Sequence, residues 1–377
     1  MQPLSILLSG GGTGGHIFPA VAIAQAVKAE VPDARFLFVG AEGKMEMEKV
    51  PAAGFAITGL PIRGFQRGSL LKNIGLPWRL LKSLARARTI VRTFHPDVAV
   101  GTGGYASGPV LAAAQRAGVP TVLQEQNSLA GATNRMLGKR ASRVCTAYPG
   151  MERYFPAGNV LLTGNPVRSE VLQVAGKRAE AMAFFGLNDG APVVFITGGS
   201  LGARGINLGI AAALPVLKAK GVQVIWQTGI PFQQQAEEAV KANTYAACKV
   251  MPFIARMDLA YAVADVVVAR AGAISVSELC LLGMPSILVP LPTAAEDHQT
   301  QNAKALVERD AAVLVADAET RGKLGAAIVA LVGDPELRQR LSASILAMAK
   351  ADAARTIAAE VIRLGRQHAL NRNSANK

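Results

Sequence analysis

Short apolar strands alternate with helical segments along the whole chain, and this alternation limits the fold more than any other feature. Strand-like runs in the first half are SILLSG (5–10), RFLFVG (35–40), DVAVGTG (97–103) and TVLQEQ (121–126). Those in the second half are APVVFITGG (191–199), VQVIWQTG (222–229), DVVVARAG (265–272) and SILVPLP (286–292). Helical patterns such as AVAIAQAVKAE (20–30) lie between them. The alternation predicts an α/β fold with parallel sheets covered by helices on both faces.

The two halves resemble each other, which favours two doubly wound, Rossmann-like domains. The segment 97–123 (DVAVGTGG…GVPTVL) is echoed at 265–288 (DVVVARAG…GMPSIL). A chain of 377 residues also favours two domains, since a domain usually has about 100–200 residues. Ligands of such sheets bind outside the carboxyl ends of the strands. We therefore expect the two sheets to face a central cleft that holds the ligands.

The domain boundary is expected within LLTGNPVRSE (161–170), where the GNP tripeptide interrupts the strand and helix pattern. This places a first domain at 1–164 and a second at 165–344. A C-terminal helix at about 345–366 is expected to pack back on the first domain.

Composition excludes several classes of protein. Half of the residues are hydrophobic and 18% are charged, so the chain can bury a large core. The cysteines, Cys145, Cys248 and Cys280, have neither metal-ligand spacing nor the even number of a disulfide framework. The first residues lack the basic and apolar regions of an export signal. No run of about 18 apolar residues could span a membrane, and we expect a protein of the cytosol.

Glycine turns follow several of the predicted strands. Gly10, Gly12 and Gly15 satisfy G-x-G-x-x-G between a strand and a helix, as in dinucleotide-binding domains. The expected acidic residue is missing where the second strand ends in Gly40. No P-loop lysine and serine follow, which disfavours a nucleoside triphosphatase. A nicotinamide-dependent dehydrogenase and a tight turn without a ligand remain as alternatives for this loop.

Two turns in the second half are better candidates for binding a nucleotide diphosphate. TGGSLGA (197–203) combines adjacent glycines with Ser200 at the start of a helix, where backbone N–H groups attract anions. RAGAISVSE (270–278) begins a second helix with small residues and carries Glu278 one turn in. That carboxylate could accept both ribose hydroxyls, or it could be an ordinary acidic residue in a first turn.

Seven motifs occur in a fixed order: GGTGGHIFPA, GGYASGP, QEQNSLAGATNR, GNPVR, GGSLGA, RAGAISVSE and EDHQTQNA. From Ser9 to beyond Ala303, the chain resembles the MurG family of bacterial transferases. These enzymes add N-acetylglucosamine to undecaprenyl-linked muramyl-pentapeptide. The resemblance implies a GT-B fold, UDP-N-acetylglucosamine as donor, lipid I as acceptor and lipid II as product. It also implies a peripheral place at the cytoplasmic face of the cell membrane, beside proteins of cell-wall synthesis and division.

The resemblance also assigns donor-binding positions. These are Thr13, Gly14, Gly15, Asn127, Arg168, Ser200, Ile254, Ala273, Ile274, Ser275, Val276, Ser277, Glu278 and Gln299. Some relatives have two adjacent glutamines where this chain has His298 and Gln299. No Asp-x-Asp metal pair is present, and we expect an inverting mechanism without a metal or other cofactor.

Sugar transfer needs a base for the acceptor hydroxyl, and two residues compete for this role. His16 lies at a predicted helix N-terminus, whose positive potential favours a neutral imidazole. Glu125 is the rival base, or it could orient its loop. Arg168 could pair with the leaving diphosphate through its guanidinium. Asn127 and Gln299 carry amides that suit sugar hydroxyls, although both could serve loop hydrogen bonds instead.

The net charge of +14 is concentrated in one segment. No acidic residue lies between Glu48 and Asp97, where the basic residues are Lys49, Arg63, Arg67, Lys72, Arg79, Lys82, Arg86, Arg88 and Arg92. A nucleic-acid-binding module is the non-enzyme alternative. Aromatic residues make up only 5% of the chain, which disfavours the stacking platforms of that class. We therefore expect no nucleic acid partner.

A membrane surface fits the same basic segment better. From Pro77 the pattern predicts a helix with a core-facing stripe of Leu80, Leu84, Ala87 and Val91. Apolar residues off this stripe are interleaved with cations, which suits an anionic membrane. The predicted membrane-facing residues are Ile74, Leu76, Trp78, Arg79, Leu81 and Lys82. The alternative is a solvated basic helix whose tryptophan is covered by a loop.

Overall fold

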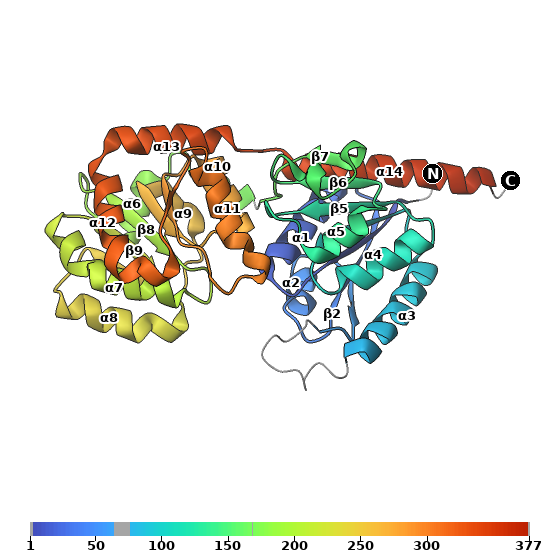
Figure 1. Cartoon of the computed structure of the whole chain (residues 1–377), viewed down its shortest axis with the longest axis horizontal. Coiled ribbons are helices and arrows are strands. Elements are labelled where there is room, and N and C mark those ends of the chain that lie inside the picture. The colour runs from blue at the N-terminus through green and yellow to red at the C-terminus, as the bar shows by residue number, and fades with distance from the viewer. Residues whose placement is uncertain (1–2, 64–75, 168, 376–377) are drawn as a thin grey trace. The chain divides into compact units, whose positions relative to one another are not determined.

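The computed structural model describes residues 3–63, 76–167 and 169–375, and the chain divides into two compact units (Figure 1). Unit 1 comprises Met1–Val167 and Lys350–Lys377, and unit 2 comprises Arg168–Ala349. Each unit contains one parallel sheet with helices on both faces. The predicted α/β class with two doubly wound domains is therefore confirmed.

Unit 1 contains a seven-stranded sheet in the order β3-β2-β1-β4-β5-β6-β7. Its strands are β1 (Ser5–Gly10), β2 (Arg35–Ala41), β3 (Ile57–Leu60), β4 (Val98–Gly103), β5 (Thr121–Glu125), β6 (Arg143–Thr146) and β7 (Val160–Leu162). Its helices are α1 (Gly14–Glu30), α2 (Glu46–Ala52), α3 (Leu76–Phe94), α4 (Ser107–Arg116), α5 (Ala132–Gly138) and α14 (Ala353–Ala375). At the centre of the sheet, Leu7 of β1 is paired in register with Leu37 of β2 on one side and Ala99 of β4 on the other.

Alternate residues of β1 supply the two cores of unit 1. Ile6 and Leu8 pack with α1 and α14 on one face of the sheet, while Leu7 packs with α3, α4 and α5 on the other. All three side chains are fully buried. A parallel strand buried on both faces needs an apolar run, and ILL (6–8) provides one at the centre of β1.

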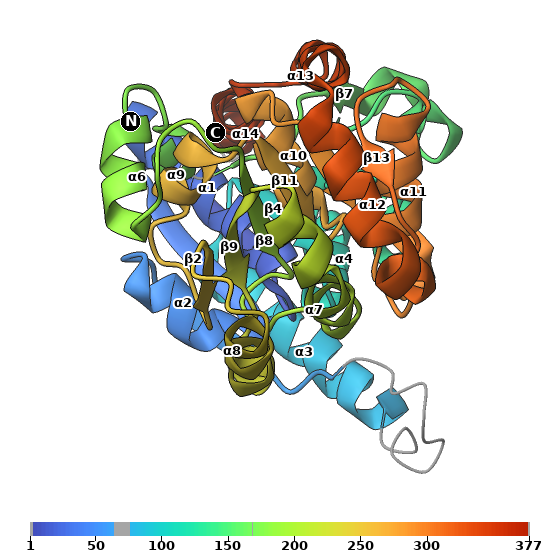
Figure 2. The same cartoon turned by 90° about the vertical axis from the view of Figure 1, so that its left-hand side faces the viewer.

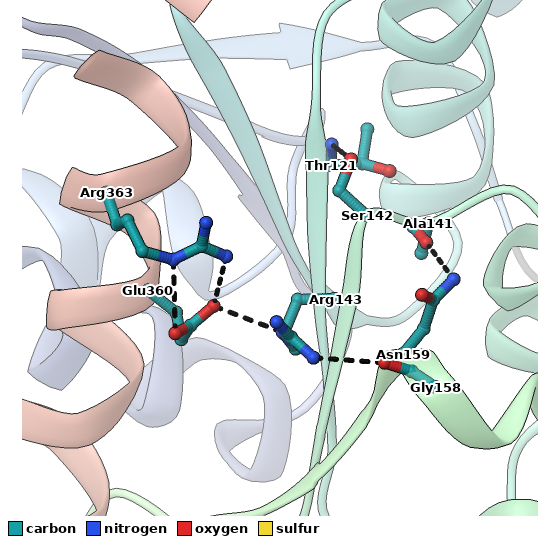
Figure 3. A network of polar contacts seen from close by, with 8 residues as sticks. All are labelled: Thr121, Ala141, Ser142, Arg143, Gly158, Asn159, Glu360 and Arg363. Atoms are coloured by element: carbon teal, nitrogen blue, oxygen red, sulfur yellow. Dashed lines mark hydrogen bonds and ion pairs between the residues drawn. The ribbon is translucent and has the colours of Figure 1, made fainter. Parts of the chain in front are cut away.

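The C-terminal helix α14 belongs to unit 1 and is held there by ion pairs as well as by its apolar face (Figure 3). Glu360 accepts hydrogen bonds from Arg363 (2.8 Å) and Arg143 (3.1 Å), and Arg143 also donates to the Gly158 carbonyl (3.2 Å). The hydrogen bond from Arg363, followed by that from Arg143, holds the pKa of Glu360 below its usual value. The Cys145 thiol on β6 is buried beneath this helix, and burial raises its pKa to about 12.

Unit 2 contains a six-stranded sheet in the order β10-β9-β8-β11-β12-β13. Its strands are β8 (Val193–Thr197), β9 (Gln223–Gln227), β10 (Cys248–Met251), β11 (Val266–Ala269), β12 (Ser286–Leu288) and β13 (Val313–Leu314). Its helices are α6 (Arg178–Phe185), α7 (Arg204–Ala219), α8 (Gln233–Ala242), α9 (Met257–Val263), α10 (Ala273–Leu282), α11 (His298–Val307), α12 (Thr320–Gly333) and α13 (Pro335–Ala347). Helices α7, α8 and α12 cover the face that buries Trp226 (Figure 2).

The core-facing stripe predicted for α3 is wrong at its first position. Leu80 is 42% exposed, whereas Ser83, Ala87 and Val91 are buried. The described side chains from 78 to 82 are all exposed, so α3 joins the core only from Ser83 onward. Small side chains at 83 and 87 let α3 approach α4 closely. Within the described ranges, no helix is long and apolar enough to cross a membrane.

Candidate functional site

The strand order of each sheet reverses at one point, and glycine loops follow the strands on both sides of it. In unit 1 the reversal lies between β1 and β4, and in unit 2 between β8 and β11. Such a switch point opens a crevice at the carboxyl ends of the strands, where doubly wound domains bind ligands. We call the segments Gly10–Gly15 and Gly103–Ser107 the unit 1 loops. Segments Gly198–Ala203 and Arg270–Ala273 are the unit 2 loops.

The unit 1 loops contact each other closely because their contact points are glycines. A Cβ at Gly104 would lie 2.1 Å from the Gly11 carbonyl oxygen, and one at Gly10 would lie 1.9 Å from Thr102 Oγ1. Gly104 also has a φ of 85°, which strains any residue with a side chain. The Gly11 N–H donates to the Gly103 carbonyl across this contact (3.3 Å). The two loops therefore form one rigid surface.

His16 lies in the first turn of α1 and is held from several directions. Its Nδ1 is 3.3 Å from the Thr13 hydroxyl, and its carbonyl accepts from the Thr102 hydroxyl at 2.7 Å. The imidazole rests against Gly103, since a Cβ there would lie 2.8 Å from His16 Cδ2. Thr13 is exposed, while Gly14, Gly15 and His16 are half-buried. The structure thus brings these four predicted residues together at the switch point.

In the first of the unit 1 loops, one backbone N–H group that a dinucleotide site would use for phosphate already has a partner within the protein. The Gly12 N–H donates to the carboxylate of Glu46, 3.1 Å from Oε2 and 3.3 Å from Oε1. A bound phosphate would compete with that internal anion for the same N–H group. The dehydrogenase alternative therefore loses a donor that its phosphate-binding loop requires.

Glu125 ends β5 and is almost completely buried. Its Oε1 accepts from the Asn127 backbone N–H (3.1 Å) and side-chain amide (3.3 Å). Its Oε2 accepts from the Gly131 N–H (3.1 Å) and the Asn134 amide (2.8 Å). Burial raises the pKa of Glu125, and these hydrogen bonds act in the opposite direction. The four donors match the four lone-pair positions of a carboxylate, so Glu125 organises the loop that carries Asn127.

Buried amides connect the ends of β4 and β5 to the segment that leaves unit 1. Gln126 donates to the Thr102 carbonyl at 2.6 Å, and Asn165 donates to the Gln126 carbonyl at 3.0 Å. Gln124 in turn donates to the side-chain oxygen of Asn165 at 2.7 Å. The asparagine of the GNPVR motif is thus part of the scaffold beneath the unit 1 loops. Arg168 of the same motif lies outside the described residues.

The first of the unit 2 loops is supported by Gln227, a residue that the sequence did not single out. Its amide nitrogen donates to the Gly199 carbonyl (2.9 Å), and its amide oxygen accepts from the Ile254 N–H (3.0 Å). This side chain joins two predicted donor-binding positions, since Ser200 follows Gly199. Ser200 is exposed in the loop after β8, whereas the Ile254 side chain is buried.

The second of the unit 2 loops ends in helix α10. Gly272 precedes the helix, and a Cβ there would meet no atom within 4 Å, so space is open at this N-terminus. Among the predicted contacts, Ala273, Ile274, Ser275 and Ser277 are half-buried, and Val276 is buried. Glu278 is 5% exposed and accepts a hydrogen bond from the Tyr261 hydroxyl at 3.2 Å.

Gln299 lies on α11 and fixes the segment after β12. Its amide oxygen accepts from the Leu291 N–H at 2.9 Å. The turn before this helix places Glu296 and Asp297 at φ values of 53° and 54°, an uncommon conformation outside glycine. Backbone of this kind is often retained at binding sites. Within the described part of the chain, no group of three or more His, Cys, Asp or Glu side chains could hold a metal.

Two family models match the chain on either side of the unit boundary. The glycosyltransferase family 28 N-terminal domain matches residues 6–146, and the C-terminal domain matches 193–357. A relative from Parabacteroides distasonis is 50% identical over 97% of this chain and 99% of its own length. One from Bacteroides fragilis is 52% identical over 97% of this chain and 96% of its own. Both are named UDP-N-acetylglucosamine--N-acetylmuramyl-(pentapeptide) pyrophosphoryl-undecaprenol N-acetylglucosamine transferase.

A solved structure shows the same relationship. The crystal structure of Acinetobacter baumannii MurG has a TM-score of 0.79 and 28% identity, covering 96% of this chain and all of that one. The chain belongs to the MurG family. Its predicted α/β fold of the GT-B type is confirmed, and so is the resemblance based on the seven motifs.

The described members of the predicted membrane-facing set lie at the start of α3. Trp78 and Leu81 are 64% and 59% exposed, and Arg79 and Lys82 are exposed beside them. The Lys82 ammonium lies 5.6 Å from the centre of the Trp78 ring. Leu76 begins the helix, and Ile74 lies outside the described residues. The described residues therefore include a small exposed patch that is both apolar and basic.

Proposed function

We propose that this chain transfers N-acetylglucosamine from UDP-N-acetylglucosamine to the muramic acid 4-hydroxyl of lipid I, with inversion, and so makes lipid II. The observation that carries this proposal is the 50% identity over 97% of the chain to a transferase named for that reaction. The glycine loops at both switch points are consistent with it, because each unit offers one ligand-binding edge.

The nucleotide end of the donor is assigned to unit 2, and the predicted donor positions of unit 1, which are Thr13, Gly14, Gly15 and Asn127, would contact its sugar. Ser200 and the N-terminus of α7 would bind the diphosphate, together with Arg168. Glu278 would accept the ribose hydroxyls beside Tyr261, and the backbone at Ile254 would border the base. Gln299 and the α10 residues would contact the remainder of the donor, including its sugar.

The reacting groups are assigned to unit 1. The acceptor 4-hydroxyl passes its proton to the imidazole of His16 as its oxygen attacks C1 of the sugar. The bond between C1 and the diphosphate oxygen breaks, and its electron pair leaves with UDP. His16 is preferred to Glu125 as the base because Glu125 already accepts four hydrogen bonds. Thr13 would set the orientation of the imidazole through Nδ1.

Direct transfer tests the proposed activity. We expect labelled UDP-N-acetylglucosamine and a lipid I analogue to yield the disaccharide product, at an unchanged rate in excess EDTA. NAD should be neither bound nor reduced. Absence of product with a correctly folded protein would refute the activity. A loss in EDTA that magnesium or manganese restores would refute only the metal-free mechanism.

We propose that the protein acts at the cytoplasmic face of the cell membrane without spanning it. The lipid tail of the acceptor is costly to remove from a bilayer, since each buried CH₂ is worth about 0.8 kcal/mol. The exposed patch at Trp78, Arg79, Leu81 and Lys82 combines apolar contact with cations, each worth about 1 kcal/mol near an anionic surface.

Vesicle binding tests this location. We expect Arg79→Glu with Lys82→Glu to weaken co-sedimentation with anionic vesicles, mainly at low salt, because salt screens the attraction. Trp78→Ala should weaken binding at high salt as well. Lys220→Glu with Arg321→Glu is the matched control, since both residues are exposed in unit 2. Transfer to a short-chain soluble acceptor should persist in all variants. Parental sedimentation of both patch variants would show that another surface meets the membrane.

A further inference from the structure

Glu46 is a fully buried carboxylate beneath the first of the unit 1 loops. It is the first residue of α2, and its Oε1 accepts from the Ala41 N–H at the end of β2 (2.9 Å). Both of its oxygens accept from the Gly12 N–H, at 3.1 and 3.3 Å. No ion pair of Glu46 occurs within the described ranges, so backbone N–H groups stabilise this anion.

Two glycines provide the space that this side chain occupies. A Cβ at Gly11 would lie 2.2 Å from Glu46 Oε1, and one at Gly40 would lie 2.5 Å from Glu46 Cγ. Neither glycine has a positive φ, so their backbone conformations do not require glycine. Their small size is needed because the carboxylate lies against them. Gly11 is an x position of G-x-G-x-x-G, so the buried carboxylate restricts a residue that the motif itself leaves open.

Gly12 connects this carboxylate to the reacting groups. The next residue is Thr13, whose hydroxyl lies 3.3 Å from His16 Nδ1. On the other side, the Gly11 N–H donates to Gly103, which contacts the imidazole. A shift of Gly12 would thus move both supports of His16 together.

We propose that Glu46 is a positioning residue for transfer and takes the place of a phosphate at Gly12. Its carboxylate accepts the hydrogen bond of the Gly12 N–H, a group that comparable glycine loops use to bind a ligand phosphate. It thereby fixes the Thr13–His16 turn, and with it the position of the His16 imidazole relative to the acceptor hydroxyl. This role rests on the proposed function, because it needs His16 to face the reacting sugar.

Glu46→Gln tests the role with little change in side-chain volume. A glutamine oxygen at the Oε1 position would leave the amide NH₂ at the Oε2 position, which lies 3.1 Å from the Gly12 nitrogen. Two donors would then face each other, so we expect the loop to shift. A displacement of about 1 Å at reacting groups can cost about 10²-fold in rate. We expect kcat to fall by about that factor, while the affinity for UDP, whose proposed contacts lie in unit 2, stays within about twofold. Glu48→Gln, exposed on the same helix, is the matched control and should keep both constants.

A double-substitution cycle tests the contact itself. Gly11→Ala should lower the melting temperature and kcat in the parent, because its Cβ meets the carboxylate. In a Glu46→Ala background that obstacle is absent, and Gly11→Ala should add little. Retained kcat in Glu46→Gln, or an equal cost of Gly11→Ala in both backgrounds, would overturn the proposal. A parent that fails to transfer the sugar would overturn the proposed function instead, and the melting temperatures would still test the contact.

Discussion

Replacing His16 by alanine is expected to lower kcat by about 10²–10⁴-fold, the usual cost of losing a general base. UDP affinity should stay unchanged, because the proposed nucleotide contacts lie in unit 2. Stability should also change little, since His16 is half-buried and the hydrogen bond from the Thr102 hydroxyl to its backbone carbonyl survives the substitution. Rapid-mixing kinetics with a lipid I analogue would measure kcat, and calorimetry with UDP would measure binding.

His368→Ala provides a matched control for this substitution. His368 lies on α14 in the same unit, in a groove beside Val119 and Ser142 that opens at the amino ends of the strands. Burial, followed by the charge of Arg372, lowers its pKa. It lies at the opposite end of the strands from the reacting groups, so its loss should leave kcat unchanged. An unaltered kcat in folded His16→Ala protein would remove His16 from the chemistry.

The place of the glycine loops in the fold could be predicted from sequence because it depends on strand ends. The strands β1 and β8 contain uninterrupted apolar runs, ILL (6–8) and VVFI (193–196), which identify central strands of parallel sheets. Once these are assigned, the glycines that follow must lie at the carboxyl edge. The strand order then places the loops after β1, β4, β8 and β11 beside the switch points.

The supporting residues could not be predicted, because their contacts cross from one strand connection to another. Glu46 occurs in KMEMEKV beside other charged residues and resembles part of a solvated helix. Only the pairing of β2 with β1 brings it under Gly12, 34 positions away. Gln227 is similar, since it meets Gly199 only after β9 pairs with β8. A local pattern carries no information about such partners.

The mistaken assignment of Leu80 has a different cause. Helical periodicity identifies a face, but it does not show where along the helix that face becomes covered. In α3 the covered part begins at Ser83, whose small polar side chain would not be chosen as a core residue. Close approach of two helices favours such small residues over leucine. An exposed leucine there adds to the apolar surface beside Trp78.

Glu125→Gln is expected to damage the loop and leave the catalytic base in place. Glutamine keeps one acceptor oxygen and gains an NH₂ group, which would face N–H donors at Gly131 and Asn134 or at Asn127. Each buried donor left without a partner costs about 1–3 kcal/mol. Denaturant titrations should therefore show that the free energy of unfolding falls by at least the cost of one unpaired donor. KM for the acceptor should rise because the loop carrying Asn127 loosens.

The pH dependence of stability should change in the same variant. Burial raises the pKa of Glu125 above its unfolded value, so the folded state binds a proton more readily in the interval between the two. Stability from this group is therefore greatest below the unfolded pKa and is lost as pH rises through the folded pKa. Glutamine cannot titrate, so the difference in unfolding free energy between parent and variant should depend on pH across that interval.

The pH–rate profile separates the two candidate bases. If His16 accepts the proton, kcat decreases at low pH as the imidazole becomes protonated, and this acid limb should persist in Glu125→Gln. If Glu125 accepts it, the limb should vanish in Glu125→Gln and remain in the residual activity of His16→Ala. The hydrogen bonds favour the first outcome, because every lone-pair position of Glu125 already faces a donor from the following loop or from α5. A carboxylate saturated in this way must lose a loop contact before it can take a proton from the acceptor.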